Sequence, residues 1–172
     1  MEGRSYWCKQ RIVKWTQDDL TCGKMDIGSK NEYPASALSN FASHTFVFDG
    51  IPVTSFEGLL QSFKFSNLET QKHVCALTGW NAKVFGRNEK WWVTRQLFWQ
   101  GEVFNRDSDE YQRLLDLAYR EMFDQSESFR KALGATGDAV LTHSIGKASP
   151  KVTILTSDEF CGRLMRLRAM LE

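Results

Sequence analysis

The chain has 172 residues and a formal net charge of +1, with 12 Phe, 6 Trp and 4 Tyr. This length is typical of one domain with a real hydrophobic core, and the near-neutral charge excludes a global basic field for nucleic acid. No apolar run approaches the roughly 18 residues that span a bilayer, and the N-terminus is too charged for a secretory signal peptide. We therefore expect a cytoplasmic protein that does not enter a membrane.

The cysteines indicate reduced thiols in mostly apolar settings, and not a metal site. Cys8, Cys22, Cys75 and Cys161 form no C-x-x-C pair, and the three histidines form no H-x-x-x-H pattern. Because zinc sites need such closely spaced ligands, we expect neither a metal nor a cofactor.

The first part of the chain predicts a loop followed by a hairpin. Residues 22–37 are polar and contain Gly and Pro, as loops do. Residues 45–49 and 51–54 flank Asp49-Gly50, a dipeptide typical of tight hairpin turns. Two short strands are therefore expected there.

A helix with an unusual polar stripe should follow the hairpin. Thr54 and Glu57 fit a capping box, with Thr54 as N-cap and Glu57 at N3, and the helix should run to about Ser66. Glu57, Gln61 and Lys64 stand at positions i, i+4 and i+7, so they share one face. A stripe of this kind just after a strand pair can form the wall of a small-molecule site.

Helical spacing dominates the rest of the chain. Residues 80–86 predict a short helical turn or loop, residues 139–143 a strand, and residues 151–155 a further strand. The expected helices are 68–78, ended by a glycine; 89–104; 109–124; 126–133; and 157–171, opened by a second capping box. The predicted fold class is mainly α, or α+β with a minor small sheet made of two or three strand pairs.

Several motifs occur in a fixed order along the chain: L-S-N-F (38–41), F-D-G (48–50), T-S-F-E-G-L-L-Q-S-F-K-F (54–65), G-R (86–87) before two tryptophans, and M-F-D-Q to A-V-L (122–141). In this order they resemble the NADAR family, the YbiA-like N-glycosidases. The resemblance covers about residues 38–141 and the closing helix. It implies a single NADAR-like domain at 31–172, with residues 1–30 as an N-terminal extension of unknown role.

The resemblance also implies an activity. Members of the family hydrolyse N-glycosidic bonds; some cleave ribosylated intermediates of riboflavin synthesis, and others remove ADP-ribose from guanine bases. It therefore implies a hydrolase with a pocket for ribose phosphate or ADP-ribose, acting on a small-molecule or nucleic-acid-linked ribosyl substrate. The functional glutamate is carried onto Glu57 and the helical lysine onto Lys64.

The chemistry of the reaction supports these two positions. N-glycosidic cleavage passes through an oxocarbenium-like state, which a carboxylate such as Glu57 can stabilise, or it can activate the attacking water. Lys64 can form a Schiff base with the sugar or hold a phosphate as a point charge. Structural roles stay open as well, since Glu57 also suits a helix cap and Lys64 a solvated helix face.

The other candidate residues are expected to contact the substrate. Amide side chains can form hydrogen bonds with ribose hydroxyls or the base, and an arginine can bind a phosphate. A tryptophan can stack on the base, although one of Trp91 and Trp92 should be buried for packing alone. The predicted substrate-binding residues are Asn40, Phe41, Gln61, Gly86, Arg87, Trp91, Trp92 and His143.

One segment departs from the family pattern. Family members usually carry an acidic residue followed by Trp-Gly in the segment that corresponds to residues 142–156, and here that segment contains no Asp, Glu or Trp. His143, Ser144 and Lys147 are its local polar side chains. The alternative to an enzyme is therefore a non-catalytic module that binds or sequesters an ADP-ribose-like nucleotide.

Overall fold

The computed structural model describes residues 23–171, which form a single domain with seven α-helices and three two-stranded sheets in that range. The predicted class, mainly helical with small strand pairs, is confirmed. The α-helices are α2 (Phe56–Ser62), α3 (Leu68–Cys75), α4 (Gly79–Phe85), α5 (Trp91–Thr94), α6 (Asp109–Gln125), α7 (Glu127–Ala135) and α8 (Ser157–Arg168), with short 3₁₀ turns at Gly86–Asn88 and Ala169–Leu171. The strands are β1 (Lys24–Asp26), β2 (Ser43–Phe48), β3 (Ile51–Ser55), β4 (Gln96–Trp99), β5 (Glu102–Asn105) and β6 (Val140–Thr142).

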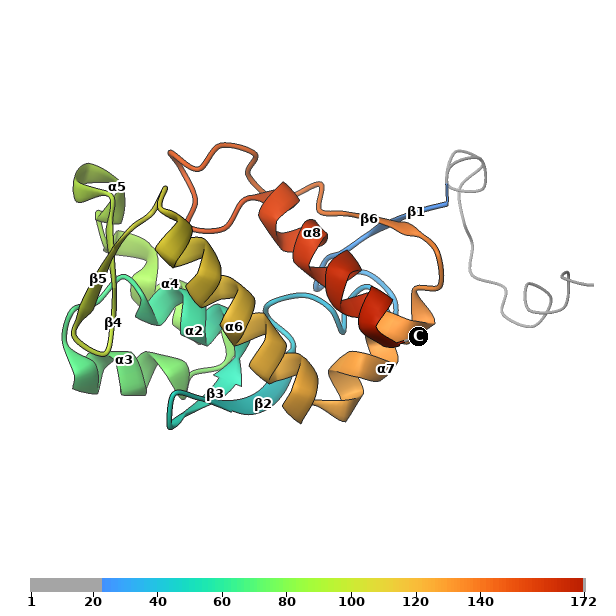
Figure 1. The fold of residues 1–172 in the computed structure, drawn as a ribbon, viewed down its shortest axis with the longest axis horizontal. Coiled ribbons are helices and arrows are strands. Elements are labelled where there is room, and N and C mark those ends of the chain that lie inside the picture. The colour runs from blue at the N-terminus through green and yellow to red at the C-terminus, as the bar shows by residue number, and fades with distance from the viewer. Residues whose placement is uncertain (1–22, 172) are drawn as a thin grey trace, which may run out of the picture.

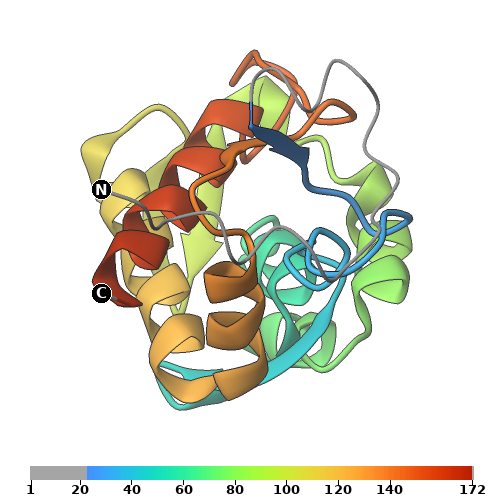
Figure 2. The ribbon, with the colours of Figure 1, turned by 90° about the vertical axis from the view of Figure 1, so that its right-hand side faces the viewer.

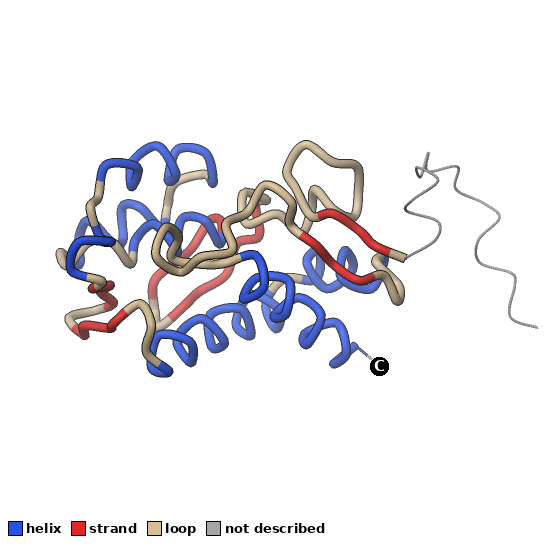
Figure 3. Tube along the Cα trace, turned by 90° about the horizontal axis from the view of Figure 1, so that it is seen from above, coloured by secondary structure: helices blue, strands red, loops and turns tan. Residues whose placement is uncertain are grey.

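The three sheets lie apart from one another and join different parts of the chain (Figure 3). β2 and β3 form the predicted antiparallel hairpin, with Asp49 and Gly50 at positive φ in its turn. β1 and β6 pair in parallel, with Asp26 opposite Thr142. The prediction of a loop throughout residues 22–37 was therefore wrong at β1, because its partner strand β6 lies far away in the sequence, at Val140–Thr142. The expected division at residues 30 and 31 stays a prediction.

Helix α6 is the central element of the core. Ser108 caps its N-terminus by accepting a hydrogen bond from Tyr111 N, and one face of the helix is buried along its whole length. Figure 1 shows α6 running between α2–α5 on one side and α7, α8 and the β1–β6 pair on the other. Tyr119 on this helix stacks on Phe56 at the start of α2, which ties α6 to α2.

The last helix begins where its sequence pattern predicts. Thr156 Oγ1 accepts from Glu159 N, and a Glu159 carboxylate oxygen accepts from Thr156 N, so the capping box is complete. The helix then packs along α6 and α7, as the view turned by 90° also shows (Figure 2).

The predicted helix over residues 89–104 was wrong. The structure has the single turn α5 and then the β4–β5 hairpin, and Arg95 between them takes a left-handed conformation with φ 61° that ends the helix. Gln100 and Gly101, both at positive φ, form the hairpin turn. Tertiary bonds select this hairpin, since Gln71 donates to Phe98 O at 3.0 Å and accepts from Gln100 N at 3.1 Å.

The start and end of α2 also differ from the prediction. Ser55, and not Thr54, is the N-cap, because Ser55 Oγ accepts from Gly58 N at 3.2 Å while the Thr54 hydroxyl donates to Ala76 O. Glu57 is therefore the second residue of the helix, not the third. The helix ends at Ser62, before Lys64.

Two further segments differ in the same way. α3 ends at Cys75. Gly79, which was expected to end that helix, instead begins α4. A Cβ at Gly79 would overlap the backbone of Phe41, so the close approach of these two segments requires glycine. Residues 151–155 form turns and no strand. Their carbonyl groups accept from side chains, with Arg106 Nε bonded to Thr153 O and Tyr111 OH to Ile154 O, both at 2.9 Å.

Two cysteines lie in the described range, and Cys75 and Cys161 are both free and buried. Burial raises the pKa of each thiol to about 11. Cys8 and Cys22 lie outside the described residues. None of the helices in residues 23–171 combines the length and the apolar character that crossing a membrane requires.

Candidate functional site

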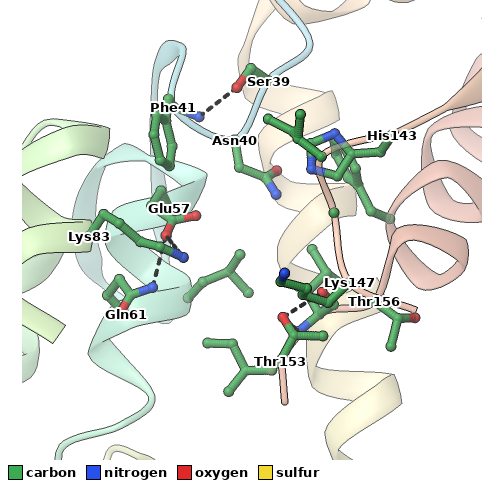
Figure 4. A pocket seen from close by; sticks show the side chains of 16 residues that line it. Ser39, Asn40, Phe41, Glu57, Gln61, Lys83, His143, Lys147, Thr153 and Thr156 are labelled. Carbon is green, nitrogen blue, oxygen red and sulfur yellow. Dashed lines mark hydrogen bonds and ion pairs between the residues drawn. The ribbon is translucent and has the colours of Figure 1, made fainter. Parts of the chain in front are cut away.

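A cavity of about 350 Å³ lies between the start of α2 and the segment that leads into α8. The loop before β2 forms its upper rim and α4 adds one lysine, while the segment 143–156 covers the opposite side (Figure 4). The segment that departs from the family pattern therefore folds over the cavity. The titratable and amide side chains in the lining are Asn40, Glu57, Gln61, Lys83, His143 and Lys147.

Glu57 is the central acidic group of the cavity wall. Its side chain is only 7% exposed, and its Oε1 accepts from Gln61 Nε2 at 2.8 Å and lies 3.3 Å from Lys83 Nζ. Its backbone N–H donates to Asn40 O at 2.9 Å, which ties the rim loop to the helix. The carboxylate is thus held in one orientation by a donor on its own helix and a cation from α4.

Gln61 is held equally tightly. It is 2% exposed, and a Cβ on Gly86 would overlap its Oε1, so the absence of a side chain at Gly86 leaves the room that this amide occupies. Gln61 Oε1 is buried and accepts no hydrogen bond within residues 23–171. The amide NH₂ donates to Glu57, and the position of the Gln61 side chain depends on the absence of a side chain at Gly86.

Asn40 and Phe41 form the rim of the cavity. Asn40 Oδ1 accepts from Tyr119 OH at 2.8 Å, so its amide NH₂ is left to donate toward the cavity. Burial raises the pKa of Tyr119 well above its usual value, which keeps this phenol protonated and able to donate. Phe41 packs edge-to-face on Trp80, with 6.4 Å between the ring centres.

The opposite wall carries an imidazole and an amine but no carboxylate. His143 Nδ1 lies 2.7 Å from Ile27 O, and Ser144 donates both its backbone N–H and its hydroxyl to Asp26, each at 2.7 Å. Lys147 follows in the same loop and also lines the cavity. The lining as a whole therefore holds one carboxylate, one imidazole and two amines, of which Lys83 lies beside Glu57 and Lys147 on the opposite wall, and this balance of charge favours an anionic ligand.

The structure brings together five of the ten residues that were predicted for the site. They are Asn40, Phe41, Glu57, Gln61 and His143. Lys64 does not line this cavity; it lies past the end of α2 and donates to Gly86 O at 2.9 Å. Burial, reinforced by the nearby charge of Lys83, lowers the pKa of Lys64 to about 8 although Glu57 and Glu89 oppose the shift.

The remaining predicted residues lie outside the cavity lining. Gly86 packs behind Gln61, and Arg87 is exposed in the 3₁₀ turn after α4. Trp91 is buried beneath the Arg95 guanidinium, 5.5 Å from its ring centre, whereas Trp92 is 47% exposed in a separate surface hollow. The substrate contacts that were expected of these residues stay predictions.

Lys83 is the charged lining residue that sequence reasoning missed. Lys83 is 26 positions from Glu57, and no helical or strand spacing connects them, so only the packing of α4 on α2 reveals the pair. Lys147 was named from the sequence as a polar side chain of the segment 142–156, although not among the predicted substrate-binding residues, and it does line the cavity. No group of three His, Cys, Asp or Glu side chains suited to a metal ion occurs in residues 23–171.

The fold is that of the YbiA-like proteins. The NMR structure of the E. coli protein YbiA matches with a TM-score of 0.60 and 20% identity, over 87% of this chain and 86% of that chain. This match confirms at the level of the fold the resemblance to the NADAR family.

The chain belongs to the family of bacteriophage protein GP30.3, whose model matches residues 32–169. A relative from Enterobacteria phage T4, the uncharacterized 17.1 kDa protein in the Gp30-rIII intergenic region, is 41% identical over 147 residues. That alignment covers 84% of this chain and 97% of the relative.

Proposed function

We propose that the protein is a hydrolase that cleaves the N-glycosidic bond of a ribosylated base or an ADP-ribose conjugate. The observation that carries this proposal is the Glu57 carboxylate, which is buried in the cavity wall and held by Gln61 and Lys83. Cleavage of such a bond develops positive charge at the anomeric carbon, and a fixed carboxylate stabilises that charge or takes a proton from the attacking water.

The other lining residues suit the rest of such a substrate. The free NH₂ of Asn40 can donate to a ribose hydroxyl, and Phe41 offers an apolar face beside it. Lys83 and Lys147 stand on different walls and favour phosphate groups through charge. The proposed substrate is therefore a phosphorylated ribosyl compound of the ADP-ribosyl-guanine or ribosylamino-pyrimidine phosphate type.

A binding module is the second candidate function. One observation favours it, because Glu57 is the sole carboxylate among the lining residues of this cavity, whereas glycosidases commonly use two. In this case the same charges and amides would hold an ADP-ribose-like nucleotide without turnover.

The test is incubation with an oligonucleotide that carries ADP-ribosylated guanine, with ribosylamino-pyrimidine phosphate and with free ADP-ribose, with products identified by mass spectrometry. Glu57→Gln should slow cleavage by about 10² to 10⁴-fold. Glu69→Gln is the matched control, since Glu69 is exposed on α3 and pairs with Lys72. Binding of ADP-ribose without turnover of any substrate would favour the binding module, and unchanged cleavage by Glu57→Gln would remove Glu57 from the chemistry.

A further inference from the structure

His143 is held so that one ring nitrogen alone is left for chemistry. Its Nδ1 lies 2.7 Å from Ile27 O, and because a carbonyl oxygen only accepts, Nδ1 carries a hydrogen and donates it. In the neutral ring the lone pair is then on Nε2, and in the charged ring the titrating proton is there.

The ring is also confined by packing. Phe160 on α8 contacts it edge-to-face, with 5.1 Å between the ring centres and 80° between the planes. A Cβ on Gly146 would overlap His143 Cδ2, so the loop backbone passes close to that edge. Nε2 makes no hydrogen bond within residues 23–171, and the ring lies on the wall opposite Glu57 (Figure 4).

Asp26 fixes both neighbours of His143. One of its carboxylate oxygens accepts from Ser144 N at 2.7 Å and from the Thr142 hydroxyl at 3.2 Å, and the other accepts from the Ser144 hydroxyl at 2.7 Å. Burial alone would raise the pKa of Asp26, but these hydrogen bonds, led by those from Ser144, outweigh burial and lower it. Asp26 therefore stays ionised and holds the loop in place.

We propose that His143 is the general acid that protonates the departing base, and that Asp26 is the positioning residue that aims it; this inference rests on the proposed glycosidic cleavage. A purine or pyrimidine nitrogen leaves poorly as an anion and needs a proton. Glu57 already serves as the carboxylate that contacts the sugar and accepts the proton of the attacking water, so it is not the group that protonates the base. Of the remaining groups in the lining, imidazole is the one whose ordinary pKa lies near neutrality, whereas the two lysine amines are weak acids.

The reaction balances with water as the one co-reactant. The water oxygen bonds to the anomeric carbon and its proton passes to Glu57, while the carbon–nitrogen bond breaks and its electron pair stays with the base. The proton on His143 Nε2 passes to the base. The products are a sugar with a free anomeric hydroxyl and a neutral base, and solvent returns the proton from Glu57 to His143.

The charges around the imidazole come from several elements. Asp26 on β1 and Glu57 on α2 are acidic, Lys83 on α4 and Lys147 in its own loop are basic, and α8 contributes the uncharged ring of Phe160. The surroundings of the proton donor therefore carry charges of both signs.

The deciding experiment compares two leaving groups on ADP-ribose. One is guanine in an oligonucleotide, which needs a proton, and the other is 4-nitrophenolate, which leaves without one. His143→Gln should lower kcat about 100-fold or more for guanine but only about threefold for 4-nitrophenolate. His73→Gln is the matched control, because His73 is exposed on α3. Equal losses on both substrates would overturn the acid role while leaving the hydrolase intact.

Two further measurements distinguish the proposed hydrolase activity, the acid role of His143 and the positioning role of Asp26. A wild-type protein that cleaves neither substrate overturns the proposed function and the acid role with it. Asp26→Ala should lower kcat for the guanine substrate about tenfold, while KM and the rate of 4-nitrophenolate release change little. Asp26→Asn keeps one acceptor oxygen and should therefore lose less activity than Asp26→Ala. Equal slowing of both substrates by Asp26→Ala would show that Asp26 has a structural role and does not position His143. Circular dichroism confirms that each variant is folded.

Discussion

Lys83 Nζ lies 3.3 Å from Glu57 Oε1, whereas Lys64, which shares a helical pattern with Glu57, donates to the Gly86 carbonyl. The amine beside the central carboxylate therefore comes from α4 and not from the end of α2. This difference changes which lysine should meet a ligand.

Lys83→Met should weaken the binding of ADP-ribose about tenfold or more, because one charge-assisted contact to a phosphate is lost. Calorimetric titration measures the dissociation constant. Lys72→Met is the matched control, since Lys72 is exposed and pairs with Glu69. Unchanged binding of ADP-ribose by Lys83→Met would contradict the assignment of the ligand to this cavity.

Lys64 should make stability rise with pH in the alkaline range. Burial lowers its pKa in the folded state to about 8 from an ordinary value of 10.5, so between these values the unfolded chain binds more protons. The free energy of unfolding of the wild type relative to Lys64→Met should increase from pH 8 to 10.5, by on the order of 2 kcal/mol. Urea unfolding at several pH values measures it.

The difference between the two proteins is the quantity to measure, because other groups act in the opposite direction. Burial raises the pKa of Tyr119 and of Cys75, so both groups oppose folding as the pH rises, equally in wild type and variant. A difference that stays flat over pH 8 to 10.5 would show that Lys64 is not desolvated in the folded protein.

Gly86→Ala should destabilise the protein by about 1–3 kcal/mol, because the new methyl group would overlap Gln61 Oε1 and displace the amide from Glu57. Catalysis or binding at Glu57 should fall together with stability. Gly134→Ala on α7 is the control, since its Cβ meets only Leu171 at 3.8 Å and alanine favours the helix. Equal effects of the two substitutions would argue against a special role for Gly86.

Arg106→Met should destabilise the protein by about 3 kcal/mol, because it leaves a carboxylate without its cation. Arg106 is 1% exposed, and its guanidinium donates to both oxygens of Glu159 and to Thr153 O. Met keeps much of the side-chain volume. Thermal and urea unfolding measure the loss, and Arg113→Met, at an exposed pair on α6, is the control.

The same pair should contribute to acid sensitivity. Burial alone would raise the pKa of Glu159, but the hydrogen bonds from Arg106 and Thr156 outweigh it and lower the pKa below the ordinary 4.5. This contribution to stability is present above pH 4.5 and is lost as the pH falls through the folded-state value. Arg106→Met should therefore lose less stability than the wild type between pH 5 and 3.

Local pattern and tertiary contact contributed differently to what could be predicted. The span of α6 and the capping box of Thr156 and Glu159 follow from side chains within a few residues of each other, and the structure confirms both. The hairpin of β4 and β5 was missed because Gln71, 25 or more positions away, supplies the bonds that hold it. Trp99 adds another such bond, from its indole N–H to Asp49 at 2.8 Å.

The candidate site divides along the same line. The sequence by itself determined that Glu57 and Gln61 share a helical face, because a spacing of four residues places them one turn apart. Tertiary structure alone decided that Lys83 completes that wall and that the loop with His143 closes the cavity, since these contacts depend on how separate elements pack. Helical periodicity acts over a few residues, and the charges around this cavity come from segments more than 80 positions apart.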